Sequence, residues 1–414
     1  MRQNNNTLDA GDRSSRRITA LAVAWCINTF AYSIAYPFLP IYLHSTRGFP
    51  MSQVGLLYLL IGLARMLAPT AGGPLVDRFG RRGMLIAAPA ARAVAYLVLA
   101  WFVYREAGFW QLSGMLFVVM FIGGFFQTAS SAYVTDVAPA QARPEAFSKI
   151  RVGLNIGWMA GPAVGAFLAR TPFALLFAVT GVLCLVTPVI VFFSCPEPEN
   201  GGAEYREGAA GGERRGLLSV LGADATFLKM LLFAFPIFLV SSQLVTTLTV
   251  FARDHIGMTG NAVGLLYTLN GLVVILFQLR LSKAIVRVNL ATRVSSGGLF
   301  YAAGYFAMAF CTTAWHAYLA VVVFTVGEML TFPSLEAASS RMAPPGMVGR
   351  YMGIYGLVWG LGYSVGPFMG SLLYGRLADQ PVRFWGVIVI SALVAAGCFT
   401  RMRGVAALQQ GEDA

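Results

Sequence analysis

Three ionisable side chains interrupt the long apolar stretches of this 414-residue sequence: Glu328, Arg65 and Arg92. If these stretches cross a membrane, a charge at the middle costs about 2.5–3.5 kcal/mol on insertion scales, so each side chain needs a physical reason for its position. Burial favours the neutral form of a carboxyl group, so Glu328 can exchange a proton near neutral pH or neutralise a cationic ligand. A glutamate that only ties neighbouring helices together is the alternative.

The two arginines have other possible roles. Arg65 can pair with Glu328 or bind an anionic ligand, whereas Arg92 is expected to have a purely structural role. We favour a structural role for Arg65 too, but keep it beside Glu328 as a candidate for proton coupling or substrate binding. The sequence has no catalytic constellation, no nucleotide-binding P-loop and no metal-ligand spacing among its five cysteines. We therefore expect no enzyme and no metal site.

The elements that carry these residues are predicted to be membrane-spanning helices. Apolar residues make up 57% of the chain and charged residues 12%, about half the charged fraction of a soluble domain. Apolar stretches of about 20 residues can cross a hydrocarbon core of about 30 Å as helices. They are continuously apolar and lack the alternation of barrel strands. Twelve spans are predicted, at 18–43, 54–76, 83–104, 112–136, 150–169, 174–194, 227–251, 261–280, 293–313, 316–340, 350–375 and 383–400.

Charge predicts the orientation of these spans. Most of the 30 Lys and Arg residues fall on the side that also holds both termini. Positive charge concentrates in cytoplasmic loops, so we expect both termini in the cytoplasm. Residues 1–17 are too polar for a cleaved signal peptide. The net charge of +12 then reflects topology, and no nucleic acid is expected as a partner.

The sequence repeats itself in its two halves. VGLLYLLIGL at 54–63 returns as VGLLYTLNGL at 263–272. A Gly-rich stretch of span five returns in span eleven at an offset of 205 residues. The matched positions are Gly157 with Gly362, Gly161 with Gly366, Pro162 with Pro367, and Gly165 with Gly370.

The prediction is an all-α membrane protein with 12 transmembrane helices in two six-helix, pseudo-symmetric bundles. The bundles cover 18–194 and 227–402, with an N-tail at 1–17, a Gly/Glu/Arg-rich linker at 195–226 and a C-tail at 403–414. Parallel repeats of this kind recur in transporters that alternate access to a site between their halves. A duplicated scaffold without transport is the alternative.

Between spans two and three the sequence reads GGPLVDRFGRR, at 72–82. We expect a short cytoplasmic turn in which glycines allow close approach or positive φ, and an arginine bridges to a carboxylate. The stretch resembles the signature loop of the major facilitator superfamily, G-x-L-x-D-R-x-G-R-[RK]. The matching residues, which the resemblance assigns to a cytoplasmic gate, are Gly73, Leu75, Asp77, Arg78, Gly80, Arg81 and Arg82.

In that superfamily the loop latches the two halves together when the transporter is open to the outside. The resemblance implies that Asp77 meets the start of helix eleven, near Arg350 and Tyr351. It also implies that Arg81 pairs with an acid at the end of helix four, where Asp136 stands. The equivalent loop of the second half keeps its positive charge but lacks the Asp-Arg-x-Gly core.

The glycines of GWMAGPAVGA, at 157–166, recur every four residues and form one smooth helix face for a close crossing. The string resembles a G-x-x-x-G-P-x-x-G-G motif of the superfamily's proton-coupled drug antiporters, with Ala166 at the last glycine. Span eleven repeats it as GYSVGPFMGS, so a packing role in both halves is an equal alternative. Span four lacks the buried arginine that many of these antiporters carry, so coupling through that residue is not implied.

By the same resemblance, helices one, four, seven and ten line a central cavity. Asn28, Gln127 and Gln243 are then candidate ligand contacts beside Glu328, although a lone amide more often joins two helices. A cavity with many aromatic and amide groups but few fixed charges suits lipophilic ligands better than sugars.

We therefore expect a major facilitator transporter of the 12-helix bacterial drug:proton antiporter group, which exports lipophilic or amphipathic small molecules by alternating access. We expect a small-molecule substrate and the lipid bilayer as partners, a monomer, and no cofactor, with the proton gradient as energy source. A uniporter, flippase or importer for a metabolite or lysolipid is the alternative within transport. A non-transporting receptor or sensor is the alternative of another class.

Overall fold

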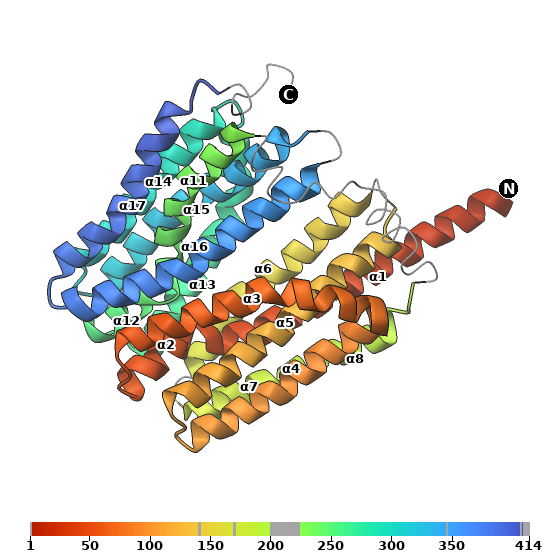
Figure 1. Cartoon of the computed structure of the whole chain (residues 1–414), viewed down its shortest axis with the longest axis horizontal. Helices are drawn as coiled ribbons and strands as arrows, with labels where there is room; N and C mark the ends of the chain where they lie inside the picture. The colour runs from red at the N-terminus through yellow and green to blue at the C-terminus, as the bar shows by residue number, and fades with distance from the viewer. Residues whose placement is uncertain are drawn as a thin grey trace. The chain divides into compact units, whose positions relative to one another are not determined.

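The computed structural model describes residues 2–139, 142–168, 171–198, 224–344, 347–405 and 408, with side chains from residue 14 onward except that of Pro144. All regular structure in these ranges is helical (Figure 1). The helix that was expected to begin at residue 18 already begins at Arg2. Most of the predicted linker at 195–226 and of the predicted C-tail at 403–414 lies outside the described residues.

The first six predicted spans coincide with helices. The first runs through α1 (Arg2–Ala35), a 3-10 turn (Tyr36–Phe38), α2 (Leu39–Ile41) and a π-helical turn (Tyr42–Thr46). The next four are α3 (Met51–Phe79), α4 (Arg81–Tyr104), α5 (Phe109–Val137) and α6 (Arg143–Leu168). The sixth is divided into α7 (Phe173–Cys184) and α8 (Val186–Ser194).

The last six predicted spans are helical too. The seventh combines α11 (Ala225–Ser241), a 3-10 turn (Ser242–Leu244) and α12 (Thr247–Asp254). The others are α13 (Gly260–Ala284), α14 (Leu290–Ala307) with a 3-10 turn (Met308–Phe310), α15 (Ala314–Met342), α16 (Val348–Leu377) and α17 (Pro381–Arg401).

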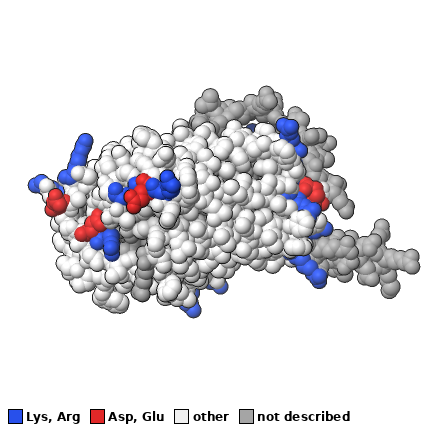
Figure 2. Space-filling view, turned by 90° about the horizontal axis from the view of Figure 1, so that it is seen from below, with Lys and Arg blue, Asp and Glu red and all other residues white. Residues whose placement is uncertain are grey.

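Length and apolar composition support membrane spans for most of these helices. Within the described residues, nine segments are long and apolar enough to cross a membrane. The other three predicted spans are α6, α14 and α16, in which Gly, Tyr, Ser or charged residues lower the hydropathy. Figure 2 shows a broad uncharged stretch of surface between charged groups at the two ends of the face. The chain is an all-α, multi-pass membrane protein.

The chain forms two compact units. Unit 1 comprises Met1–Phe38 and Leu63–Glu213, and unit 2 comprises Leu39–Gly62 and Arg214–Ala414. The first span thus passes from one unit to the other at Phe38, between Pro37 and Pro40. Proline removes a backbone donor and crowds the preceding turn, and here regular α-helix gives way to 3-10 and π-helical turns. A segment at 39–62 therefore packs as part of unit 2.

In unit 1, the backbones of α6 and α1 approach closely at the predicted glycine motif. A Cβ at Gly161 would lie 2.8 Å from the Phe30 carbonyl oxygen and would collide with the Ser33 hydroxyl. Ser33 Oγ donates a hydrogen bond across this contact to the Gly157 carbonyl over 3.0 Å. Gly165 occupies the next position on the same face, against Phe38. The glycines are required here because a side chain would force the two helices apart.

Unit 2 repeats this arrangement with α16 and the α11 segment. A Cβ at Gly366 would lie 2.7 Å from the Leu239 carbonyl oxygen and would collide with the Ser242 hydroxyl. Gly362 and Gly370 flank it on the same face. Ser242 follows Ser33 by 209 residues, the offset of the repeated decapeptide. The internal repeat therefore appears as the same helix contact within each unit.

We predict that Gly366→Ala lowers the thermal stability of the protein. Overpacking a close contact costs about 1–3 kcal/mol, because backbone atoms cannot move aside as a side chain can. Gly356→Ala, in the same helix, is the matched control, because a Cβ there meets nothing within 4 Å. The melting temperatures of the two detergent-purified variants give the comparison. Equal melting temperatures would contradict the assigned role of Gly366.

Candidate functional site

A cluster of charged side chains joins the ends of α3, α4 and α5 in unit 1. Arg81 Nε donates to Asp136 Oδ2 over 2.9 Å, and Arg81 Nη1 donates to Asp77 Oδ1 over 3.3 Å. The Arg81 and Asp136 side chains are only 4% and 7% exposed, whereas Asp77 is 47% exposed. The structure thus contains the Arg81–Asp136 ion pair that the resemblance implied. Its role in a gate stays a prediction.

Most of the motif at 72–82 lies on helices and not in a turn. α3 continues to Phe79 and α4 begins at Arg81, so Gly80 alone connects them. Gly80 has φ of +78°, a left-handed conformation that favours glycine. Gly73 lies within α3, and a Cβ there would meet nothing within 4 Å. The left-handed turn requires a glycine at position 80. No described neighbour would collide with a side chain at position 73, so packing within the described structure does not require a glycine there.

Glu197 belongs to this cluster, although the motif gave no indication of it. Its Oε1 accepts from the Arg81 backbone N–H over 2.8 Å, and its Oε2 accepts from that of Arg82 over 2.9 Å. The carboxylate therefore satisfies two of the unpaired donors at the start of α4 and complements the helix dipole. Arg82 Nη2 donates in turn to the Phe192 carbonyl in α8 over 2.8 Å. The only sequence signal was an acidic run directly after span six.

In unit 2, the Tyr351 side chain forms a hydrogen bond with a residue of the same unit, Asp224. Its hydroxyl donates to Asp224 Oδ2 over 3.0 Å, while Asp224 Oδ1 caps α11 by accepting from the Phe227 N–H over 2.9 Å. The predicted meeting of Asp77 with the start of helix eleven would join the two units, and it stays a prediction.

Glu328 lies halfway along α15, with its side chain half-buried. Asn270 Nδ2, from α13, donates to Glu328 Oε2 over 2.9 Å and to Thr325 Oγ1 over 2.9 Å. No basic residue pairs with Glu328 among the described residues of unit 2. An amide N–H can donate to a carboxylate or to the carbonyl oxygen of a protonated acid. This environment therefore accommodates both protonation states of Glu328.

Close packing between α14 and α15 fixes the direction of Glu328. A Cβ at Gly327 would lie 2.7 Å from the Gly297 carbonyl oxygen, and one at Gly297 would lie 2.9 Å from the Gly327 carbonyl oxygen. The α15 face at Gly327 is therefore filled by α14. Successive helical residues are about 100° apart, which turns Glu328 away from this contact and toward Asn270.

Two guanidinium groups lie among tyrosines in the middle of unit 1. Arg65 Nη2, from α3, donates to the Tyr32 hydroxyl, and Arg65 Cζ lies 5.4 Å from the Tyr36 ring centroid. Arg92 Nη1, from α4, donates to Asn28 Oδ1 over 3.1 Å, and Arg92 Cζ lies 5.2 Å from the Tyr32 ring centroid. Such cation–π contacts stabilise a charge by about 0.5–2 kcal/mol each. Neutral groups therefore hold both arginines.

The three amides that were predicted as ligand contacts have different surroundings. Asn28 is buried, and its carbonyl oxygen is bound to Arg92. Gln243 is buried, and its Nε2 donates to the carbonyls of Leu239 and Gly366 over 2.8 Å each. Gln127 is exposed on α5. Of the three, Gln127 is the one whose amide is not engaged by the described residues.

The family model described as Major Facilitator Superfamily matches residues 21–367. The chain belongs to the Major Facilitator Superfamily. It is a membrane transporter with the twelve-helix major facilitator fold and not an enzyme.

Two relatives with about a quarter of their residues identical extend over most of the length of this transporter. It is 26% identical over 371 residues to the Na(+), Li(+), K(+)/H(+) antiporter of Planococcus maritimus, covering 81% of this chain and 84% of that one. It is 25% identical over 397 residues to the multidrug resistance protein MdtH of Aeromonas hydrophila, covering 92% and 95%. A solved bacterial homolog of the human lysosomal transporter Spinster superposes with a TM-score of 0.73 at 14% identity, over 93% of this transporter and 95% of that chain. At this identity the superposition shows the fold alone.

In this transporter, the segment 39–62 contacts helices of unit 2 at two places. Ser45 Oγ donates to Asp254 Oδ1 over 2.8 Å, and His44 Nε2 lies 3.6 Å from Asp254 Oδ2. On α3, a Cβ at Gly55 would lie 2.7 Å from the Ser371 Cβ, and one at Gly62 would collide with Ser364 of α16. The two glycines of the decapeptide at 54–63 therefore serve close packing on α16.

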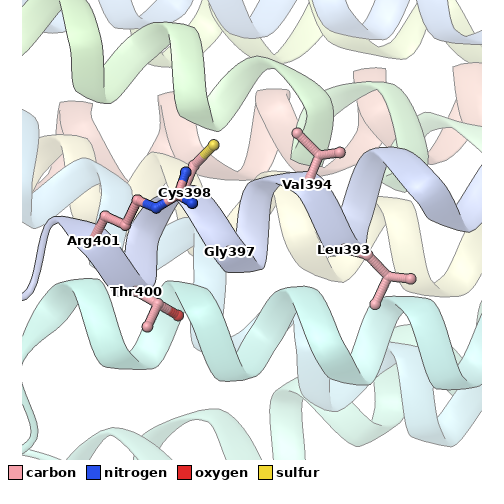
Figure 3. A pocket seen from close by; sticks show the side chains of 6 residues that line it. All are labelled: Leu393, Val394, Gly397, Cys398, Thr400 and Arg401. Atoms are coloured by element: carbon pink, nitrogen blue, oxygen red, sulfur yellow. The ribbon is translucent and has the colours of Figure 1, made fainter.

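A shallow groove of about 440 Å³ lies on α17 (Figure 3). Its lining residues are Leu393, Val394, Gly397, Cys398, Thr400 and Arg401. All six belong to one helix, so the groove does not bring together polar groups from different elements. We assign it no part in transport.

We predict that Asp136→Asn destabilises the transporter. Removal of one partner from a buried ion pair costs about 3–5 kcal/mol, and the remaining Asp77 offsets part of this loss for Arg81. Glu145→Gln is the control, because Glu145 is 72% exposed and pairs with Lys149 over 3.0 Å. Exposed pairs of this kind contribute about 0.3–0.5 kcal/mol. A melting temperature of Asp136→Asn no lower than that of the control would show that the buried pair adds nothing to stability.

Proposed function

We propose that this transporter exports lipophilic or amphipathic small molecules in exchange for protons by alternating access, with Glu328 as the proton-carrying group. The observation that carries this proposal is the environment of Glu328, at the middle of α15 beside the neutral amide of Asn270. Placing an ionisable side chain at this depth of a membrane costs free energy of insertion. Glu328 is therefore a candidate functional group.

The hydrogen-bond partner of Glu328 is the neutral amide of Asn270, which favours a proton-carrying role of Glu328 over a purely structural one. A carboxylate with a fixed cationic partner stays ionised, because the nearby charge favours the charged form. Glu328 has no such partner among the described residues of unit 2, and its hydrogen bond from Asn270 Nδ2 is compatible with either form. Its protonation can then follow the pH of the side to which it is exposed.

The substrate class and direction are supported by the names of relatives. The Aeromonas hydrophila relative is named a multidrug resistance protein, and the Planococcus maritimus relative is named a cation/proton antiporter. The glycine motif gives weaker support, because in both units it packs helices together. We infer that no cofactor is needed, that the proton gradient supplies the energy, and that the transporter acts as a monomer.

Proteoliposomes with an imposed pH gradient test the role of Glu328. We expect the wild-type transporter to move lipophilic dyes from a diverse panel against their gradient, with protons moving in the opposite direction. Glu328→Gln keeps the size and hydrogen-bonding capacity of the side chain but cannot titrate, so uphill transport should fall at least about tenfold. Glu336→Gln, in the same helix, should retain it. Dye fluorescence and internal pH are the two readings.

The other outcomes separate the alternatives. Proton-coupled export that persists in Glu328→Gln would remove this residue from the coupling step. Flux that ignores the pH gradient in the wild-type protein would favour a uniporter or flippase for a metabolite or lysolipid. Binding without any flux would favour a receptor or sensor.

We also propose that both termini lie in the cytoplasm, because most Lys and Arg fall on the side of the termini. We propose the bacterial inner membrane as the location, because the relatives from Planococcus maritimus and Aeromonas hydrophila are bacterial proteins. We expect a C-terminal green fluorescent protein fusion to fluoresce and a C-terminal alkaline phosphatase fusion to be inactive. The reverse result would place the C-terminus outside the cytoplasm.

A further inference from the structure

Arg65, Arg92, Tyr32, Tyr36 and Trp158 form one positively charged aromatic cluster in the middle of unit 1, which we call the Arg65 cluster. The Tyr32 ring centroid lies 5.5 Å from Arg65 Cζ and 5.2 Å from Arg92 Cζ, so it contacts both cations. The Trp158 ring centroid, from α6, lies 5.8 Å from that of Tyr32 and 6.2 Å from that of Tyr36. Helices α1, α3, α4 and α6 thus all contribute to the cluster or border it.

Among the described residues of unit 1, the two positive charges of this cluster have no acidic partner. Arg65 Nη2 donates there to the Tyr32 hydroxyl and, at 3.9 Å, to the Met120 sulfur, and Arg92 Nη1 donates to the Asn28 carbonyl. Among the described residues of unit 1, no Asp or Glu pairs with either arginine. The acid on the same helix, Asp77, lies twelve residues further along α3, about 18 Å along its axis.

The guanidinium groups also keep hydrogen-bond donors that the described residues do not use. Arg92 is 8% exposed, and its Nε is buried without a hydrogen-bond partner in the described structure. Arg65 is exposed, and its Nε and Nη1 make no hydrogen bond to the described residues. A guanidinium presents five N–H donors in a planar fork, which matches the two oxygens of a carboxylate or sulfonate.

We propose that the Arg65 cluster binds the negatively charged group of the substrate, and that the transported molecules are organic anions with an aromatic or other apolar part. Arg65 contacts the anionic group, while the half-buried Trp158 offers flat apolar surface beside it and packs against the buried Tyr36 ring. Arg92 is a positioning residue, because it holds Tyr32 against Arg65 and adds positive charge behind it. This inference rests on the proposed transport function and narrows its substrate class.

Three matched naphthalene probes test the preference for anions. Naphthalene-2-sulfonate is the anion, naphthalene-2-sulfonamide is neutral and 2-naphthyltrimethylammonium is the cation. Isothermal titration of the purified transporter should give at least tenfold tighter binding of the sulfonate than of the other two. Equal binding of all three, or tighter binding of the cation, would overturn the inference.

Variants at Arg65 identify the site. Loss of a hydrogen bond to a charged group costs about 1.5–3 kcal/mol, so Arg65→Gln should weaken sulfonate binding about 10–100-fold and leave the sulfonamide nearly unchanged. Arg65→Lys should retain part of the preference because it keeps the charge without the planar fork. Lys149→Gln, which removes an exposed charge from the same unit, should bind like the wild type. Unchanged sulfonate binding by Arg65→Gln would overturn the assignment.

Two further readings separate the competing explanations. Arg65 can instead serve only as a structural partner, for instance of Glu328. In that case Arg65→Gln should lower the melting temperature, and the wild-type transporter should show no preference for anions. This pair of results overturns the inference. Flux in proteoliposomes distinguishes this failure from failure of the proposed function. Gradient-driven flux without a preference for anions overturns the subsite alone, whereas tight sulfonate binding without flux of any probe supports the subsite and overturns transport.

Discussion

Direct backbone contact between helices, made possible by glycine, is the constraint on which both units depend. Lipid tails are as apolar as the helices, so close packing and hydrogen bonds must hold the helices together. In unit 1, the crossing that brings Ser33 to Gly157 also brings the neighbouring residues Tyr32 and Trp158 to each other. In unit 2, the contact at Gly327 sets the direction of the next residue, Glu328. The packing glycines thus place the side chains on which the proposed chemistry depends.

The ionisable groups differ mainly in the kind of side chain that contacts them. Arg81 is buried between two acids at the helix ends, so its charge is fixed and its contribution is structural cohesion. Arg65 is held by tyrosines, and no acid among the described residues of unit 1 compensates its positive charge. Glu328 is held by an amide, which leaves its protonation state open. The kind of partner, more than depth alone, separates a fixed ion pair from a site that can bind or titrate.

Much of the fold could be predicted from the sequence, because an uninterrupted apolar stretch has few other structural solutions. Each of the twelve predicted spans falls on a helical segment of the described structure, and nine of these segments are long and apolar enough to cross a membrane. Helix ends extend beyond the predicted bounds; α3 runs to Phe79 and not to residue 76. The family resemblance at 73–82 also pointed to the contact between Arg81 and Asp136, which stand 55 residues apart. The glycine motif left packing and antiport as equal alternatives. Its contacts in both units account for it by packing, so it says little about direction.

The side-chain surroundings could not be predicted in the same way. A helix that is apolar on every side gives no sign of which face meets which neighbour. The sequence therefore could not decide whether Asn28 and Gln243 contact a ligand or join two helices, whereas the structure shows both engaged, by Arg92 and by the Gly366 carbonyl. Glu197 was hidden for another reason, since its partners are backbone N–H groups that leave no residue signature.

The break in the first helix at Pro37 and Pro40 has a consequence for how the gene duplication relates to the folded protein. The repeat in the sequence and the compact units both divide within the linker, but the units also divide after Phe38 and before Leu63, so residues 39–62 belong to the second unit. A polypeptide that begins after the linker would lack the glycines at 55 and 62 and the Asp254 contacts of His44 and Ser45. The second six-helix repeat therefore does not contain all the residues of the compact unit to which it belongs.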